Sequence, residues 1–259
     1  MKNKKLHQKI QGKGKPTLIF THGWVNNQTV WREEVKELKK KYQCLTYDIR
    51  GHGLSKKPKN KINYSLEVFS EDIDYLIKTN DIKNYVLIGH SMGGMISLYH
   101  QATRKQAQAL ILIDTTTDLD RYDFDKITSI VKKLISHIPE FDNRKLLAKT
   151  EITIHPYTFM QQLAFLEGLR NTPMYVVMHC LDMMVNMNLD EEAKKIKVPT
   201  LIIHGEKDIT LSSVHGKHIK KLIPHATLKL YKDDNHLVPL NNPKKLIKDI
   251  KSFLKNALD

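Results

Sequence analysis

A serine set between glycines is the best candidate for a nucleophile in this chain. Ser91 lies in the segment 89–94, GHSMGG, directly after the apolar run 85–88 and directly before a stretch of helical character. Glycines two residues before and two residues after such a serine allow a sharp strand-to-helix turn that exposes its hydroxyl. The amide of Met92, at the start of that helix, would then face a developing oxyanion. An ordinary glycine-rich turn with a capping serine is the alternative interpretation.

A serine nucleophile needs a base, and position in the chain selects one of the thirteen histidines. His236 follows the apolar stretch 227–231 and precedes by seven residues Pro243, which opens the last predicted helix. A histidine on a loop after a strand is free to reach a serine on another loop. His236 is therefore the predicted base.

The acid that orients such a base is assigned by similar reasoning. Asp208 lies in the segment 205–208, GEKD, directly after the predicted strand 200–204. Serine, aspartate and histidine then follow three different strands in that order. The carboxyl ends of parallel strands meet at one edge of a sheet, so the three side chains are expected to converge there. Asp114, at the end of another predicted strand, is the alternative acid.

The segment His22-Gly23-Trp24 follows the predicted strand 17–21 and is predicted to supply the second oxyanion donor. A strand-ending glycine followed by a core tryptophan is the alternative interpretation. A glycine at a strand end leaves an adjacent backbone amide free to bind an oxyanion. We assign that amide to Trp24, whose indole is also a candidate for lining an acyl pocket. His22 is interpreted as structural rather than catalytic.

Short apolar runs alternate with helical patterns over most of the chain. Such alternation is typical of a mostly parallel sheet with helices on both faces, so the predicted fold class is α/β. The predicted strands are residues 5–11, 17–21, 44–49, 85–88, 109–113, 200–204 and 227–231. The predicted helices are residues 28–41, 66–77 (with Ser65 as N-cap), 92–104, 214–222 and 243–254.

The alternation stops between residues 117 and 195, where no strand pattern is present and apolar residues recur at helical spacing. We therefore predict a core domain formed by residues 1–116 and 196–259, with residues 117–195 inserted as a helical cap, or lid. Six of the nine methionines lie in this insertion. Methionine suits adaptable apolar surfaces, so Met160, Met174 and Met178 are candidates for an acyl pocket together with Trp24. Ordinary packing of the cap helices is the alternative.

These motifs resemble those of the α/β-hydrolase superfamily, in particular its lidded esterase and lipase-like members. The resemblance rests on residues 22–24, 48–55 (DIRGHGLS), 89–94 and 205–208 and on His236 with the proline after it. Residues 48–55 are interpreted as architecture rather than chemistry. The N-terminal hairpin is shorter than in many relatives, and Asn235 stands where glycine is usual.

The resemblance implies a serine hydrolase that cleaves carboxylic esters through an acyl-enzyme intermediate, as a carboxylesterase or a monoacylglycerol-type lipase. Its substrate would be a small ester with an apolar acyl chain, and no metal or organic cofactor would be needed. Other serine-based reactions remain open: thioester, carbon–carbon and N-terminal peptide hydrolysis, and perhydrolysis. A weakly catalytic small-molecule binding protein on the same fold is the rival from another class.

The composition limits the partners that we expect. The net charge is +14, but only six of the 42 basic residues are arginine and the lysines are scattered, so we do not expect nucleic acid as a partner. No apolar run approaches the ~20 residues of a membrane helix, and no apolar segment follows the basic N-terminus, so we expect a cytoplasmic protein without stable membrane insertion. Cys44 and Cys180 are predicted to be buried reduced thiols, with a single disulfide as the alternative. The oligomeric state is left open.

Overall fold

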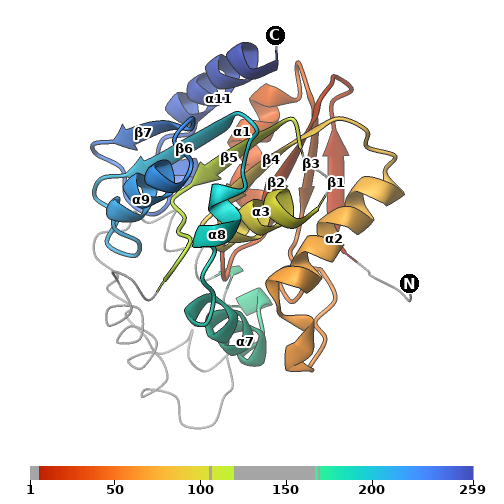
Figure 1. Ribbon diagram of the computed structural model, residues 1–259. Coiled ribbons are helices and arrows are strands. Elements are labelled where there is room, and N and C mark those ends of the chain that lie inside the picture. Colours follow the sequence, from red (N-terminus) through yellow and green to blue (C-terminus); the bar gives the residue numbers. More distant parts are fainter. Residues whose placement is uncertain (1–5, 105–106, 120–166, 169, 259) are drawn as a thin grey trace.

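The computed structural model describes residues 6–104, 107–119, 167–168 and 170–258 (Figure 1). Within them, seven strands form one sheet in the order β1-β3-β2-β4-β5-β6-β7. Strand β1 pairs antiparallel with β3, and every other pairing is parallel. The strands are β1 (Gln8–Gln11), β2 (Thr17–Thr21), β3 (Gln43–Tyr47), β4 (Tyr85–His90), β5 (Ala109–Ile113), β6 (Thr200–Gly205) and β7 (Thr227–Tyr231). The predicted mostly parallel α/β sheet is confirmed.

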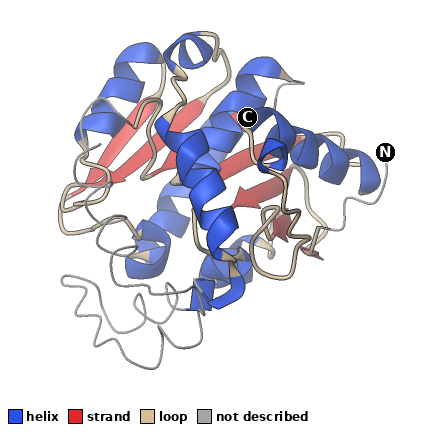
Figure 2. Ribbon diagram, turned by 90° about the horizontal axis from the view of Figure 1, so that it is seen from below, coloured by secondary structure: helices blue, strands red, loops and turns tan. Residues whose placement is uncertain are grey.

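Helices cover both faces of this sheet (Figure 1, Figure 2). Helices α2, α3, α8 and α9 lie on one face, and α1 and α11 pack against each other on the opposite face. The helices are η1 (Gln28–Trp31), α1 (Arg32–Leu38), η2 (Lys61–Asn63), α2 (Leu66–Thr79), α3 (Met92–Thr103), α7 (Met174–Val185), α8 (Asp190–Lys194), α9 (Val214–Leu222), α10 (Val238–Asn241) and α11 (Pro243–Leu258).

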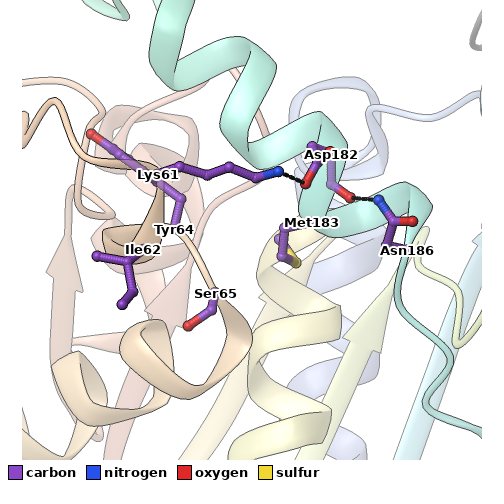
Figure 3. A pocket seen from close by; sticks show the side chains of 7 residues that line it. All are labelled: Lys61, Ile62, Tyr64, Ser65, Asp182, Met183 and Asn186. Carbon is purple, nitrogen blue, oxygen red and sulfur yellow. Dashed lines mark hydrogen bonds and ion pairs between the residues drawn. The ribbon is translucent and has the colours of Figure 1, made fainter.

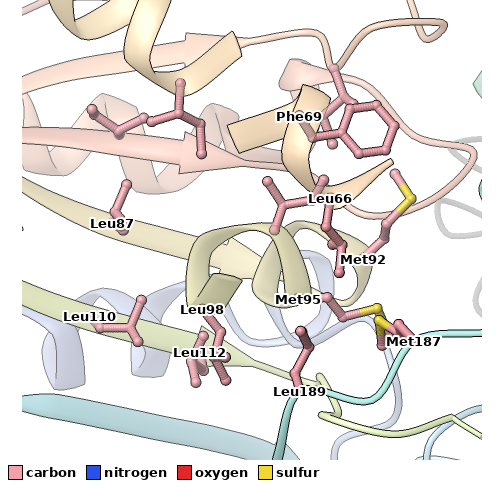
Figure 4. Close-up of a cluster of buried hydrophobic side chains, with 14 of the residues drawn as sticks. Leu66, Phe69, Leu87, Met92, Met95, Leu98, Leu110, Leu112, Met187 and Leu189 are labelled. Atoms are coloured by element: carbon pink, nitrogen blue, oxygen red, sulfur yellow. The ribbon is translucent and has the colours of Figure 1, made fainter. Parts of the chain in front are cut away.

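The sheet separates two apolar cores because successive side chains of a strand point to opposite faces. In β4, Leu87 packs toward α2 and α3, whereas Val86 and Ile88 pack toward α1 and α11. Figure 4 shows part of the first core, where Met92 and Met95 of α3 lie near Leu66 of α2. Since both faces are buried, the strands are continuous apolar runs, which is the pattern that the sequence displays.

Capping side chains set the starts of two helical segments. The Ser65 hydroxyl accepts a hydrogen bond from the Val68 amide at 3.2 Å, which confirms it as the N-cap of α2. The single helix predicted over residues 28–41 is instead a 3₁₀ turn, η1, followed by the shorter α1. Asn27 begins this turn, because its side-chain oxygen accepts the Thr29 amide at 2.9 Å.

Backbone contacts join the two ends of the predicted cap segment. The Leu189 amide donates to the Thr117 carbonyl at 2.7 Å, and Asp118 forms a β-bridge with Asn188. Most of the segment lies outside the described residues, so its division from the core remains a prediction. Helix α7 (Met174–Val185) lies within the segment predicted to be helical.

Cys44 and Cys180 are free and buried, which confirms the predicted thiols. In the described parts of the chain, no helix is both long enough and apolar enough to cross a membrane.

One buried carboxyl group on α1 has no hydrogen-bond partner among the described residues. Glu34 is fully buried, and both of its carboxyl oxygens are unpaired, as is the indole nitrogen of Trp31 one turn earlier. Burial raises the pKa of Glu34 to about 8, because the apolar surroundings disfavour its charged form. The folded protein therefore keeps a proton on Glu34 at pH values where the unfolded chain has released it.

This proton makes stability depend on pH. Between the ordinary pKa of 4.5 and about 8, unfolding releases the Glu34 proton, so the free energy of unfolding falls as pH rises, by about 1.4 kcal/mol per pH unit. We expect Glu34→Gln to remove this slope, so that its Tm rises relative to wild type from pH 5 to pH 8 in thermal denaturation. Glu33→Gln, at the exposed neighbouring position, is the control. Parallel pH dependences for wild type and Glu34→Gln would contradict the assignment.

Candidate active site

Ser91 lies at the sharp turn between β4 and α3. Its backbone has φ 52° and ψ −124°, a left-handed φ that residues other than glycine rarely adopt. Two hydrogen bonds stabilise the turn: the Ser91 amide donates to the Ile113 carbonyl at 2.9 Å, and the Thr115 hydroxyl donates to the Ser91 carbonyl at 2.7 Å. Strain of this kind persists only where the surrounding structure enforces it, and it is common at functional sites.

The glycines around Ser91 are required by close backbone packing. A Cβ atom at Gly89 would lie 2.3 Å from the Gly93 carbonyl oxygen. A Cβ atom at Gly93 would lie 2.2 Å from the carbonyl oxygen of Thr21 at the end of β2. Both distances are far below van der Waals contact, so only glycine lets α3 begin directly against the sheet.

The structure brings Ser91, Asp208 and His236 together. His236 Nε2 lies 3.0 Å from Ser91 Oγ, and His236 Nδ1 lies 2.7 Å from Asp208 Oδ2. Because the Asp208 carboxylate can only accept, Nδ1 carries the proton and Nε2 is free to accept the serine proton. The other Asp208 oxygen accepts the amides of Thr210 and Leu211 at 2.8 and 2.9 Å, which fixes the carboxylate in place.

The charges of this pair reinforce each other. Burial opposes the charged forms of both side chains, but the contact between them outweighs it. The pKa of Asp208 is held below its usual range by His236 and by a contact from His204. The pKa of His236 is raised above its usual 6.5 by the charge and the hydrogen bond of Asp208. A site of this kind stabilises the imidazolium that forms when His236 takes a proton.

Asp114, the alternative acid, lies close to this group but has a different role in the geometry. Its carboxylate oxygens accept the amides of Gly205 at 2.9 Å and Val238 at 3.2 Å. It is Asp208 that forms the hydrogen bond to the imidazole of His236. The assignment of Asp208 rather than Asp114 as the acid remains a prediction.

The segment predicted to supply the oxyanion donor passes directly beside the serine. A Cβ atom at Gly23 would lie 3.2 Å from Ser91 Cβ, so the backbone of Gly23 lies directly beside Ser91. Among the described residues, neither the Trp24 amide nor the Met92 amide donates to a backbone carbonyl. The role of both amides in binding an oxyanion remains a prediction.

His22 takes part in the architecture. Its Nε2 accepts the Ile49 amide at 2.9 Å, and its Nδ1 donates to the Gly23 carbonyl at 2.8 Å. Burial lowers the pKa of His22 to about 4, so the ring is neutral at physiological pH. In the segment 48–55, Asp48 likewise anchors the backbone by accepting the amides of Gln28 and Leu54.

Three further residues contact the site without having been singled out by sequence reasoning. Thr115 bonds the serine backbone, as described above. His90 Nε2 donates to the His236 carbonyl at 2.7 Å. His204 Nε2 lies 2.8 Å from the Leu211 carbonyl and 3.4 Å from Asp208 Oδ2. All three lie at or just beyond the carboxyl ends of strands, which is the only signal that the sequence offers for them.

Comparison with known proteins decides the family. The family model of the alpha/beta hydrolase fold matches residues 16–243. The chain belongs to the alpha/beta hydrolase fold family. The non-heme chloroperoxidase CPO-A1 of Kitasatospora aureofaciens is 25% identical to this hydrolase-family chain over 94% of this chain and 93% of its own length. The 3-oxoadipate enol-lactonase 1 of Acinetobacter baylyi is 23% identical over 93% of this chain and 89% of its own length.

Solved structures show the same fold. An esterase from Exiguobacterium antarcticum superimposes on this family member with a TM-score of 0.82 and 21% identity, covering 96% of this chain and 95% of the other. A bromoperoxidase from Bacillus anthracis also gives a TM-score of 0.82, with 22% identity, covering 96% and 94%. These proteins are named for different activities, so membership of the family does not identify the reaction of this chain.

The predicted pocket residues are only partly described in this family member. The Trp24 indole donates to the Val177 carbonyl of α7 at 3.2 Å. Trp24 and Met178 are both partly buried against the apolar core on the α2 and α3 side of the sheet. Met174, at the start of α7, is half-buried. Met160 lies outside the described residues. An acyl pocket lined by these four residues therefore remains a prediction.

A surface hollow of about 410 Å³ lies between η2 and α7, and none of the predicted pocket residues lines it (Figure 3). Lys61 reaches across it to form an ion pair with Asp182 at 2.8 Å. Ser91, Asp208 and His236 do not line this hollow. The lining residues are Lys61, Ile62, Tyr64, Ser65, Asp182, Met183 and Asn186.

The contact between Gly93 and β2 can be tested by substitution. We expect Gly93→Ala to lower the free energy of unfolding by about 3 kcal/mol or more, which corresponds to ~6 °C or more in Tm, because backbone atoms of β2 must move. The control is Gly216→Ala in α9, where the three atoms nearest to the added Cβ all belong to the side chain of His204 and none lies closer than 3.0 Å. Equal and small changes in Tm for both variants would show that the turn tolerates a side chain.

Proposed function

We propose that this protein is a serine hydrolase that cleaves carboxylic esters through an acyl-enzyme intermediate. One observation carries the proposal: His236 lies between Ser91 Oγ at 3.0 Å and Asp208 Oδ2 at 2.7 Å, at the carboxyl edge of the sheet. A hydroxyl, an imidazole and a carboxylate in this order constitute an activated nucleophile. The relatives named esterase and enol-lactonase support this choice, since a lactone is a cyclic ester.

In the first half of the proposed reaction, His236 Nε2 takes the proton of the Ser91 hydroxyl as the oxygen attacks the ester carbonyl. The carbonyl electrons move to its oxygen, which the amides of Trp24 and Met92 stabilise. When this intermediate collapses, the bond to the alcohol oxygen breaks and His236 returns the proton to the departing alkoxide. Ser91 is left as an acyl ester, and the alcohol departs.

In the second half, water attacks the acyl carbon while His236 Nε2 takes one of its protons. The second tetrahedral intermediate uses the same two amides. Its collapse breaks the bond to Ser91 Oγ, which recovers the proton from His236, and the carboxylic acid is released. Asp208 keeps Nδ1–H of the imidazole oriented throughout, and its charge stabilises the imidazolium in both halves.

A second candidate is perhydrolysis, favoured by the relatives named chloroperoxidase and bromoperoxidase. In that reaction hydrogen peroxide would replace water in the second half and release a peroxy acid, with the same proton transfers at His236. The nucleophile and the acyl-enzyme would be unchanged. Competition between water and peroxide in the same assay separates the two reactions.

The proposed function also includes a substrate class and a location for the protein. An apolar acyl chain of moderate length is proposed as the ligand of Trp24 and the methionines of segment 117–195, which would form a helical cap. No nucleic-acid partner is proposed. A cytoplasmic location is proposed on the free buried thiols of Cys44 and Cys180.

Hydrolysis of p-nitrophenyl esters from acetyl to dodecanoyl tests the reaction and the pocket together. We expect turnover by the wild type with an optimum beyond acetyl, and a loss of about 10⁴-fold or more in kcat for Ser91→Ala. Ser97→Ala, which removes a buried hydroxyl on the same helix, is the matched control and should retain activity. Turnover that survives in Ser91→Ala would rule out this nucleophile, and a steady fall from acetyl to octanoyl would rule out the apolar pocket.

The pH dependence of kcat/KM tests the base and the acid. His236 must be neutral to accept a proton, and its pKa is raised, so we expect activity to increase with pH with a midpoint above 6.5. Asp208→Asn should lower kcat by about 10³-fold or more and move this midpoint to lower pH, because the charge that favours the imidazolium is gone. Asp233→Asn, at an exposed aspartate nearby, should change neither. An unchanged midpoint in Asp208→Asn would contradict the assigned acid.

A further inference from the structure

A buried carboxylate lies where the loops that carry Asp208 and His236 meet. Asp114 follows β5 and is completely buried. One of its oxygens accepts the amide of Gly205, three residues before Asp208, and the other accepts the amide of Val238, two residues after His236. Its own amide donates to the Ile203 carbonyl of β6 at 2.9 Å. This single side chain therefore contacts both loops.

We propose that Asp114 is a positioning residue, which joins the acid-bearing loop to the base-bearing loop and thereby holds Asp208 and His236 at hydrogen-bonding distance. The inference rests on the proposed function, since it concerns how the same three residues are kept in register. Asp114 is not itself in contact with the reacting atoms in this assignment.

The backbones of the two loops touch, which makes a shared anchor effective. A Cβ atom at Gly205 would lie 2.4 Å from the Asp234 carbonyl oxygen and 2.6 Å from that of Asn235. No side chain separates the loops at this point, so a movement of one is transmitted to the other. Asp114 bonds Gly205, the residue at which this contact occurs.

The two hydrogen bonds require a carboxylate rather than an amide. Both partners of Asp114 are N–H donors, and they bind separate oxygens at 2.9 and 3.2 Å. An asparagine of nearly the same shape has one oxygen and one NH₂ group, so one backbone amide would face a donor. In a fully buried site, that amide would lose its partner.

Asp114 also contributes charge to the site. The charged and titratable groups around it come from β4, β6, β7 and the two loops, and they are His90, His204, Asp208, His236 and Tyr231. His90 Nε2 lies 3.8 Å from Asp114 Oδ2. Burial raises the pKa of Asp114 to about 6, so it is mainly ionised at neutral pH. Burial lowers the pKa of His90 to about 3, which leaves that ring neutral. The Asp114 charge therefore adds to that of Asp208 in raising the pKa of His236.

The test uses a readout that needs the nucleophile and base but no particular ester. We would measure the second-order rate constant for labelling of Ser91 by a fluorophosphonate between pH 5 and pH 9, in wild type and Asp114→Asn. We expect the plateau rate of the variant to fall about tenfold or more. We also expect the acid limb of the pH–rate profile, where labelling increases as His236 loses its proton, to move to lower pH by about half a unit or more. The reason is that a negative charge near His236 is removed.

A matched control separates positioning from general loss of stability. Asp48 is another buried aspartate whose oxygens accept two backbone amides, those of Gln28 and Leu54, at 2.9 and 2.8 Å. Asp48→Asn should lower Tm without moving the acid limb. Should Asp114→Asn fail to fold, Asp114→Ser, which keeps one acceptor oxygen, is measured with the same expectations.

Labelling of Asp114→Asn at the wild-type rate and with the wild-type acid limb would overturn the proposal. An equal displacement of the limb in Asp48→Asn would also overturn it. A wild type that is labelled at Ser91 but hydrolyses no ester would sink the proposed ester activity and leave the role of Asp114 open to this same measurement. A wild type in which Ser91 is not labelled would overturn both.

Discussion

The contact between the first turn of α3 and the end of β2 is the constraint on which the site depends. Gly93 lies so close to the carbonyl oxygen of Thr21 that no side chain fits between them. This contact lets α3 start directly over the sheet, immediately after Ser91 with its left-handed φ of 52°. Gly23, which follows β2, lies directly beside Ser91 in the same region.

The charged groups at the carboxyl edge of the sheet are stabilised as a set rather than one by one. Asp208 is buried, but two backbone amides and the imidazole of His236 bind its oxygens. Asp114 is buried as well, and two further amides bind its oxygens. The pKa of Asp114 rises only to about 6, whereas the pKa of Glu34, which is buried elsewhere in the described chain without such donors, rises to about 8. Burial alone thus neutralises a carboxyl group, whereas burial among N–H donors keeps it charged.

The sequence predicted well those features that follow from local pattern. The apolar runs predicted the parallel strands, and the glycine spacing predicted the turn at Ser91. The positions of Asp208 and His236 after successive strands predicted that they would meet. Asp114 was noticed as a strand-end aspartate, but its bonds to Gly205 and Val238 depend on which loops come together in space. The same applies to the contacts of His90 and Thr115, because their partners are far away in the sequence.

The bonds that join the two ends of segment 117–195 have a consequence for how such a protein can change over evolution. The chain leaves the sheet after β5 and returns at β6, which are hydrogen-bonded neighbours. The Leu189–Thr117 bond and the Asp118–Asn188 bridge close the segment at its base. Since the two ends are fixed side by side, the residues between them can be lengthened, shortened or exchanged without altering the spacing of the strands. The part of the chain that would meet a substrate can therefore diversify independently of the residues that would carry out the chemistry.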